Sequence, residues 1–307
     1  MGRATIILNG PSERVVASGV VSVALLVLVA CGRDGSAASA VAGGNRPAAF
    51  TLGALMAPAM DTLSDGNLRL HRSSRTRPPV AGRWTLTFAD EFNGLRLDLN
   101  KWRPNWLGHS DHAITKPVHR SELSCYDPAQ VREGRGVLTL SLRRQACKAN
   151  NGVTYAYRSG LIQSRHQYEF TYGYMEARMW LPHGTGIAVN WPAFWANGTG
   201  KWPSTGEIDV MEVLGATSVC WHLHRPGGTP GGCPGLADLD GWHTFGALWE
   251  REKITFYYDR SSVGQVTRAV PSTPMFLVAN LGVSRREGGP ISTPAITHID
   301  YIRVWQQ

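Results

Sequence analysis

Apolar residues recur at every second position through much of the C-terminal part of this chain, and this period of two restricts the fold more than any other feature. Leu138, Leu140 and Leu142 alternate with polar residues, which is the pattern of a β-strand with one buried face. Similar β-rich runs, bounded by Gly, Pro or Asp, occupy residues 170–178, 254–258 and 276–279. No long amphipathic helix with capping residues stands out. The sequence therefore predicts an all-β sandwich of two antiparallel sheets joined by short turns.

Aromatic residues locate the folded domain. All 11 Trp and all 9 Tyr lie at or after Trp84, and such side chains carry much of the apolar area that a core or a sugar-binding cleft buries. We therefore place the domain at residues 82–307 and expect a monomer. Its net charge is only +4, from 23 Lys and Arg against 19 Asp and Glu, although the whole chain carries +8. Part of that excess is an Arg-rich run at 69–77, which we interpret as a solvated tether, so no nucleic-acid partner is expected.

The N-terminal segment predicts export. An apolar run at residues 15–30 is short for a membrane span and typical of a signal peptide, which we place at residues 1–30. It ends in Leu28-Val29-Ala30-Cys31, which resembles the lipobox of bacterial lipoproteins, whose Cys receives lipid. We expect a protein anchored through Cys31 on the outer side of the cell membrane, with anchor-free secretion or an uncleaved anchor as alternatives. Ala, Gly, Ser and Pro fill 25 of the 50 positions from 32 to 81, which predicts a disordered linker over 31–81.

The cysteines beyond Cys31 agree with an exported protein. They are Cys125, Cys147, Cys220 and Cys233. Four thiols outside the cytoplasm indicate disulfides, and three pairings are possible. We favour Cys125–Cys147 and Cys220–Cys233, because each pair closes a short local loop.

A zinc site is the rival interpretation of the second cysteine pair. Its ligands would be Cys220, His222, His224 and Cys233. The alternation of the two histidines would place both imidazoles on one face of a strand. Because the spacing matches no common zinc motif, we expect the disulfide.

The segment with the clearest chemical content is Glu207-Ile208-Asp209-Val210-Met211-Glu212. On a regular strand Glu207 and Asp209 would share a face while Glu212 pointed away. One extra residue forming a β-bulge, most simply at Met211, would return Glu212 to the face of the other two. Three carboxylates would then line one cleft.

Such crowding is costly, because neighbouring like charges raise at least one pKa. Glycoside hydrolysis uses this arrangement: one carboxylate attacks the anomeric carbon, and another, kept protonated, delivers a proton to the leaving oxygen. A solvent-facing acidic strand or a calcium site is the alternative interpretation of the same three residues.

The same six residues match the ExDxxE active-site motif of glycoside hydrolase family 16, in the bulged form of laminarinase-like enzymes. Other segments resemble the family in its order along the chain, over about residues 84–305. These are residues 88–94, 97–102, 172–178, 191–195, 243–245, 280–282 and 300–305. The resemblance implies a β-jelly-roll whose concave face binds a polysaccharide.

The resemblance also implies residue roles. Glu207 would be the nucleophile, Glu212 the general acid and then base, and Asp209 the residue that hydrogen-bonds and tunes the nucleophile. Trp191 and Trp202 would contact sugar rings. Trp faces stack on sugars, although core packing is the competing explanation and is equally good for Trp195.

Two further groups of residues take roles from the resemblance. His224 resembles a family histidine near the leaving-group side of the cleft, and His222 is then its neighbour that points outward. A structural calcium on the convex face would map onto Glu91, the backbone of Gly136, and Asp300, although Asp300 also suits a pair with an Arg. No cofactor is required for the reaction itself.

The motif and the resemblance together predict an exported enzyme that cleaves internal bonds of β-1,3-glucan, with mixed β-1,3-1,4-glucan as a further substrate. The expected mechanism is a retaining double displacement. Residues 105–117 and 217–235 match no family segment, and they would edge the cleft. Alternatives are a wall transglycosylase, a non-catalytic glucan-binding protein, or an agar or carrageenan hydrolase. The last would use arginines in loop-like stretches, namely Arg120, Arg225, Arg285 and Arg286.

Overall fold

A computed structural model describes residues 77–184, 186–215, 218–236 and 238–307. The predicted signal peptide, Cys31 and nearly all of the linker lie outside these residues. Within them the only helix is a short 3₁₀ turn at Pro128–Gln130, which Asp127 caps by accepting a hydrogen bond from the amide of Ala129. No helix in the described ranges has the length and apolar character that a membrane crossing requires.

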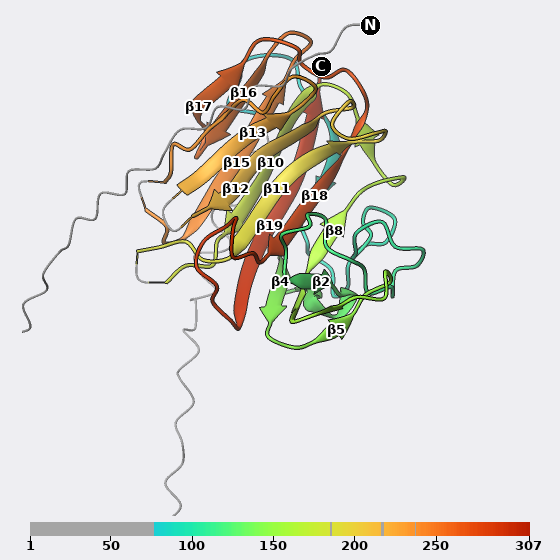
Figure 1. The fold of residues 1–307 in the computed structure, drawn as a ribbon. Coiled ribbons are helices and arrows are strands. Elements are labelled where there is room, and N and C mark those ends of the chain that lie inside the picture. The colour runs from blue at the N-terminus through green and yellow to red at the C-terminus, as the bar shows by residue number, and fades with distance from the viewer. Residues whose placement is uncertain (1–76, 185, 216–217, 237) are drawn as a thin grey trace, which may run out of the picture. The chain divides into compact units, whose positions relative to one another are not determined.

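Two large β-sheets form the domain and lie face to face (Figure 1). The larger sheet runs in the order β17 (Ser261–Val266), β16 (Ile254–Tyr258), β15 (Trp242–Trp249), β10 (Gly173–Trp180), β19 (Ala295–Gln306), β4 (Val137–Arg143), β7 (Tyr157–Ser159) and β2 (Ser124–Tyr126), with β1 (Thr85–Asp90) paired to β19 and β3 (Val131–Gly134) paired to β4.

The smaller sheet carries the predicted carboxylates. Its order is β14 (Gly231–Gly232), β13 (Ser218–His224), β12 (Glu207–Leu214), β11 (Trp191–Gly198), β18 (Met275–Gly282) and β8 (Leu161–Gln163), with β9 (Glu169–Phe170) paired to β18. A separate ribbon joins β5 (Cys147–Lys148) to β6 (Thr154–Tyr155). Strand β12 therefore lies inside its sheet, with β11 on one side and β13 on the other.

The core fills the space between the two sheets. Leu138, Leu140 and Leu142 are fully buried in it, as their alternation in sequence predicts. From the smaller sheet, Phe194 and Ala196 of β11 reach the same cluster, while their neighbours in the strand face away. The predicted all-β sandwich is confirmed, and one face of the smaller sheet remains free to form a site.

Two details of the predicted strands are wrong. The run at 170–178 is not one strand, because the chain leaves the smaller sheet after Phe170 and enters the larger one at Gly173. Tyr172 and Gly173 both have positive φ (61° and 138°), and a Cβ on Gly173 would lie 2.5 Å from the carbonyl oxygen of Trp305. The sheets are also not wholly antiparallel, since β2 pairs with β7 in parallel.

Both disulfides join the cysteines that the local-loop argument favours. Cys125 and Cys147 lie at an S–S distance of 1.99 Å, and Cys220 and Cys233 at 2.08 Å. The alternative zinc site is therefore wrong, because two of its four ligands are consumed in a covalent bond.

Candidate active site

A β-bulge in β12 determines which side chains face the open side of the smaller sheet. Asp209 pairs with His222 of β13, but Glu212 pairs with Cys220, so two residues, Val210 and Met211, oppose one. Against β11 the pairing likewise jumps from Asp209 to Met211, which leaves Val210 as the inserted residue on that side. The predicted bulge is present and involves both residues.

Because of the bulge, the side chains of β12 divide into one set that faces the core and one set that faces a cavity. Ile208, Met211 and Val213 lie in the core, together with Val210. The other residues of the strand, Glu207, Asp209, Glu212 and Leu214, line a cavity of about 630 Å³ on the opposite face of the sheet. The three carboxylates thus share one face, as the bulged motif requires.

Aromatic and polar side chains complete this cavity, which we call the cleft. Besides β12, the residues that line it are Trp106, Val118, His119, Glu122, Trp191, Ala193, Trp195, Asn197, Trp202, His222, His224, Thr229, Asn280 and Glu287. Trp202 is 54% exposed and Trp191 is partly buried, so both can meet a ligand. Trp195 is buried and donates its indole N–H to Asn280 at 2.8 Å, so it forms a wall of the cleft.

Glu212 is held at both carboxylate oxygens. Oε2 accepts a hydrogen bond from the indole N–H of Trp191 at 3.0 Å, and Oε1 lies 2.7 Å from Nδ1 of His222. The histidine that contacts the predicted acid is thus His222 and not His224. The expectation that His222 points outward is wrong, because both imidazoles of β13 face the cleft.

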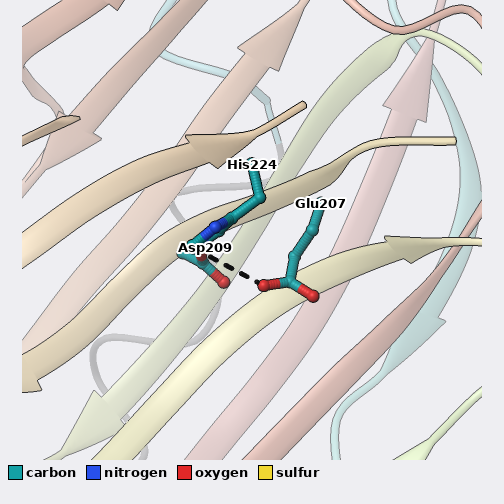
Figure 2. Close-up of side chains that lie close together, drawn as sticks. All are labelled: Glu207, Asp209 and His224. Atoms are coloured by element: carbon teal, nitrogen blue, oxygen red, sulfur yellow. Dashed lines mark ion pairs between the residues drawn. The ribbon is translucent and has the colours of Figure 1, made fainter. Parts of the chain in front are cut away.

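Glu207, Asp209 and His224 form a second group in the cleft. Nε2 of His224 lies 3.1 Å from Oδ2 of Asp209 and 3.7 Å from Oε1 of Glu207 (Figure 2). Oδ2 of Asp209 is buried and accepts no hydrogen bond. Trp202 lies over the same histidine, with ring centroids 5.9 Å apart.

Burial dominates the electrostatics of these acids. Loss of solvent raises the pKa of Glu207 well above its ordinary value, the charge of Asp209 raises it further, and His224 opposes the shift. Burial and the charge of Glu212 likewise raise the pKa of Asp209. The pKa of His222 is raised by its hydrogen bond to Glu212, against the opposing effect of burial. Burial therefore favours the protonated forms of Glu207 and Asp209.

A metal ion has one geometric candidate among the described residues. One ligand atom from each of Glu207, Asp209 and His224 lies within 4.8 Å of the others. These three residues include two of the acids that the sequence predicts for the reaction.

Two of the predicted calcium residues, Glu91 and Asp300, already have cationic partners. Arg303 contacts both carboxylate oxygens of Glu91 at 2.6 and 2.7 Å, and Arg178 lies 3.0 Å from Asp300. A calcium ion would have to displace two arginines there, so the side chains do not fit it in this arrangement. Calcium at Glu91, Gly136 and Asp300 stays an untested prediction.

The sequence assigns no catalytic role to His222, Glu122 or Tyr126. His222 contacts Glu212, and its alternation with His224 was the available signal. Glu122 and Tyr126 are buried, and the Tyr126 hydroxyl donates to Glu122 at 2.5 Å and accepts from the amide of Asn280 at 3.0 Å. Burial raises the pKa of Glu122 to about 7. No short-range pattern in the sequence connects Asn280 or His222 with the segment that contains Glu122 and Tyr126.

Comparison with family models finds two matches. The model for glycosyl hydrolases family 16 matches residues 122–303, which include the whole carboxylate strand. A model for beta-glucan synthesis-associated proteins of the SKN1/KRE6/Sbg1 type matches residues 17–205 and ends before Glu207. The first match is therefore the one that contains the site.

Individual relatives agree with the first match. The chain is 29% identical to the endo-1,3-1,4-beta-glycanase EglC of Rhizobium meliloti over 72% of this chain and 51% of the relative. It is 29% identical to a beta-glucanase of Rhodothermus marinus over 75% of this chain and 88% of the relative. It spans about half or less of the first three curated relatives that it matches.

A solved structure supports the same assignment. The catalytic domain of a laminarinase from Thermotoga petrophila RKU-1 superimposes with a TM-score of 0.64 and 28% identity, over 74% of this chain and 99% of that one. Together with the family match across the carboxylate strand, this places the chain in glycosyl hydrolases family 16.

Proposed function

We propose that this protein hydrolyses internal β-1,3-glucosidic bonds of glucans, with mixed β-1,3-1,4-glucans as the second substrate. The single observation that carries the proposal is the bulged strand, which presents Glu207, Asp209 and Glu212 together in a cleft walled by tryptophans. The names of the relatives, which include a glucan endo-1,3-beta-glucosidase of Niallia circulans, supply the linkage.

The proposed reaction proceeds in two displacements. The Glu207 carboxylate attacks the anomeric carbon while Glu212 gives its proton to the glycosidic oxygen, so the bond to the leaving sugar breaks as the bond to Glu207 forms. Glu212 then takes a proton from water, whose oxygen replaces Glu207 at the anomeric carbon. The pKa values of Glu207 and Asp209 are both raised, so the two acids compete for protons. Attack requires the ionised form of Glu207, and Asp209, by keeping its proton, can donate a hydrogen bond to the carboxylate that Glu207 becomes when it leaves.

The charge of the cleft favours a neutral polysaccharide. Among the described residues that line it there is no Lys or Arg, and Glu122 and Glu287 add two acids to the three on β12. Arg120, Arg225, Arg285 and Arg286, which would serve a sulfated galactan, are absent from this lining. One relative is a keratan-sulfate endo-1,4-beta-galactosidase, but the recognition of sulfate would need cations that these walls lack.

The test is a panel of laminarin, mixed-linkage glucan, agarose and carrageenan, with the sizes of the products determined by chromatography and their anomeric form by NMR. We expect oligosaccharides from laminarin with the β-configuration retained. Cleavage of a galactan with laminarin left intact would refute the substrate assignment, and an inverted product would refute the mechanism. Added oligosaccharide acceptors distinguish hydrolysis from transglycosylation.

We also propose that the enzyme acts outside the cell, tethered by lipid at Cys31. The support is the apolar run that ends in Leu28-Val29-Ala30-Cys31, together with two disulfides in the domain. Cys31→Ser should move the protein out of the membrane fraction or block its processing. Unchanged fractionation would refute the anchor.

A further inference from the structure

His222 is the residue through which β13 reaches the predicted acid. It lies opposite Asp209 in the register, yet its side chain extends along the sheet to Glu212, where Nδ1 is 2.7 Å from Oε1. The imidazole is mostly buried, with 19% of its side chain exposed. Since Trp191 occupies the other oxygen of Glu212, two neighbouring strands fix the carboxyl group between them.

The ring of His222 is supported from behind by β14. Gly231 pairs with His222, and a Cβ on this glycine would lie 1.9 Å from Cδ2 and 2.5 Å from Nε2 of the imidazole. The strand can pass this close to the ring only because residue 231 has no side chain. The disulfide between Cys220 and Cys233 ties this short strand to β13, so the ring is held between Glu212 and the backbone of Gly231.

We propose that His222 is a positioning residue for Glu212, with the proton on Nδ1 donated to Oε1. The inference rests on the proposed function, because it concerns the group that protonates the leaving oxygen. In the first displacement Glu212 loses its proton to the glycosidic oxygen, and the Nδ1–H of His222 bonds to the carboxylate that results. In the second displacement Glu212 regains a proton from water, while His222 keeps its own throughout.

The opposite placement of the proton would be unproductive. If Glu212 donated its O–H to a bare Nδ1, the acid's proton would point at β13 and away from the sugar. The raised pKa of His222, which arises mainly from its hydrogen bond to Glu212, agrees with a proton on the histidine. The groups that face His222 are Glu212, Asp209 and His224, and only the first lies within hydrogen-bond distance.

The test compares two variants of nearly equal shape in the full chain. In His222→Asn the amide nitrogen takes the place of Nδ1, whereas His222→Leu has a methyl group there. On the polysaccharide that the wild type cleaves, we expect Leu to lower kcat/KM by about 10²-fold and Asn to recover at least about tenfold of that loss. On a dinitrophenyl glycoside, which leaves without a proton, kcat/KM should fall less than about threefold in both.

Equal losses for Asn and Leu, or equal losses on both substrates, would overturn the proposal, because a purely structural role does not depend on the leaving group. A support variant adds a check. Gly231→Ala should displace the ring and reproduce part of the loss, whereas Gly134→Ala, whose Cβ meets nothing within 4 Å, should not. Unchanged activity in Gly231→Ala would show that β14 does not hold the histidine and would overturn that part.

A measurement without turnover separates this inference from the proposed function. In ¹⁵N-histidine NMR of the full chain, Nδ1 of His222 should be protonated at pH 7, and Glu212→Gln should lower the pKa of His222 because it removes the charge that raises it. An unprotonated Nδ1 at that pH would overturn the inference. If no glucan in the panel is cleaved, the proposed function fails, and the NMR result still decides the state of His222.

Discussion

The carboxylates on the two sides of this molecule have opposite partners. On the outer face of the larger sheet, Glu91 is bound by Arg303, and Glu176 accepts hydrogen bonds from two tyrosines at 2.7 Å with Arg260 at 3.6 Å. In the cleft of the smaller sheet, Glu207 and Glu212 have only histidines as ionisable positive partners among the described residues.

This difference shows where the fold gives up stability for a site. A buried acid with a fixed cation is satisfied and inert, whereas buried acids crowded together keep protons and can exchange them. Glu207 and Asp209 have raised pKa values because of burial and the repulsion of neighbouring acids, and we expect the protein to be less stable for carrying them.

The largest expected effect is on activity in the cleft. Glu207→Gln should lower kcat on glucan by about 10⁴-fold, because the covalent step loses its nucleophile. The free energy of unfolding at pH 7 should not fall, since the change removes a carboxyl group whose raised pKa makes ionisation costly. Glycan assays and denaturant unfolding of the same preparation check both parts, and a destabilised variant would contradict the contrast.

On the outer face the effect should fall on stability. Glu176→Ala leaves two tyrosine hydroxyls and Arg260 without their shared acceptor in a fully buried position. We expect the free energy of unfolding to drop by about 3 kcal/mol, with kcat within about twofold of wild type in the molecules that remain folded. A variant that is stable but inactive would show that Glu176 takes part in the reaction. It would refute the view that acids on the outer face serve stability and acids in the cleft serve catalysis.

The pH dependence of stability tests an acid on the cleft side. Burial raises the pKa of Glu122 from 4.5 to about 7, so the folded state binds its proton more tightly than the unfolded chain. This contribution is present below about pH 4.5 and is lost as the pH rises through 7, at a cost of about 3 kcal/mol. Glu122→Gln should therefore lose less stability than wild type between pH 5 and pH 8. Urea unfolding at both pH values measures this loss. An equal loss of stability in wild type and in Glu122→Gln would contradict the assignment.

The smallest effect is expected at the exposed arginines. Arg285→Ala and Arg286→Ala should change kcat/KM for a neutral glucan by less than about twofold, because neither side chain lines the cleft. A tenfold loss in steady-state assays would show that the substrate reaches them and would weaken the argument for an uncharged polysaccharide.

The sequence predicts the carboxylate strand well because its information is local. If Glu207, Asp209 and Glu212 are to share one face, their spacing requires a bulge, and the two disulfides close short local loops. The break at Tyr172 was missed, because alternation continues through it while the backbone turns from one sheet to the other. The strand pattern places His222 and His224 on one face, but it does not tell which of the two reaches Glu212.

Contacts between residues far apart in the chain account for the site features that the sequence does not predict. Glu122 and Asn280 are joined through Tyr126 although they are far apart in the chain, and only the packing of both sheets brings them together. The arginine partners of Glu91 and Asp300 are similarly distant in sequence. Such pairs decide whether a carboxylate is structural or reactive, and composition alone does not reveal them.

The most direct test of the central claim is to trap the covalent intermediate. A 2-deoxy-2-fluoro laminaribiosyl donor with a good leaving group should form a glycosyl-enzyme that hydrolyses slowly, and peptide mass spectrometry can locate the added sugar. We predict one fluorinated laminaribiosyl group on Glu207 and none on Glu212 or Asp209. A label on another residue, or turnover to an inverted product without any label, would contradict the account.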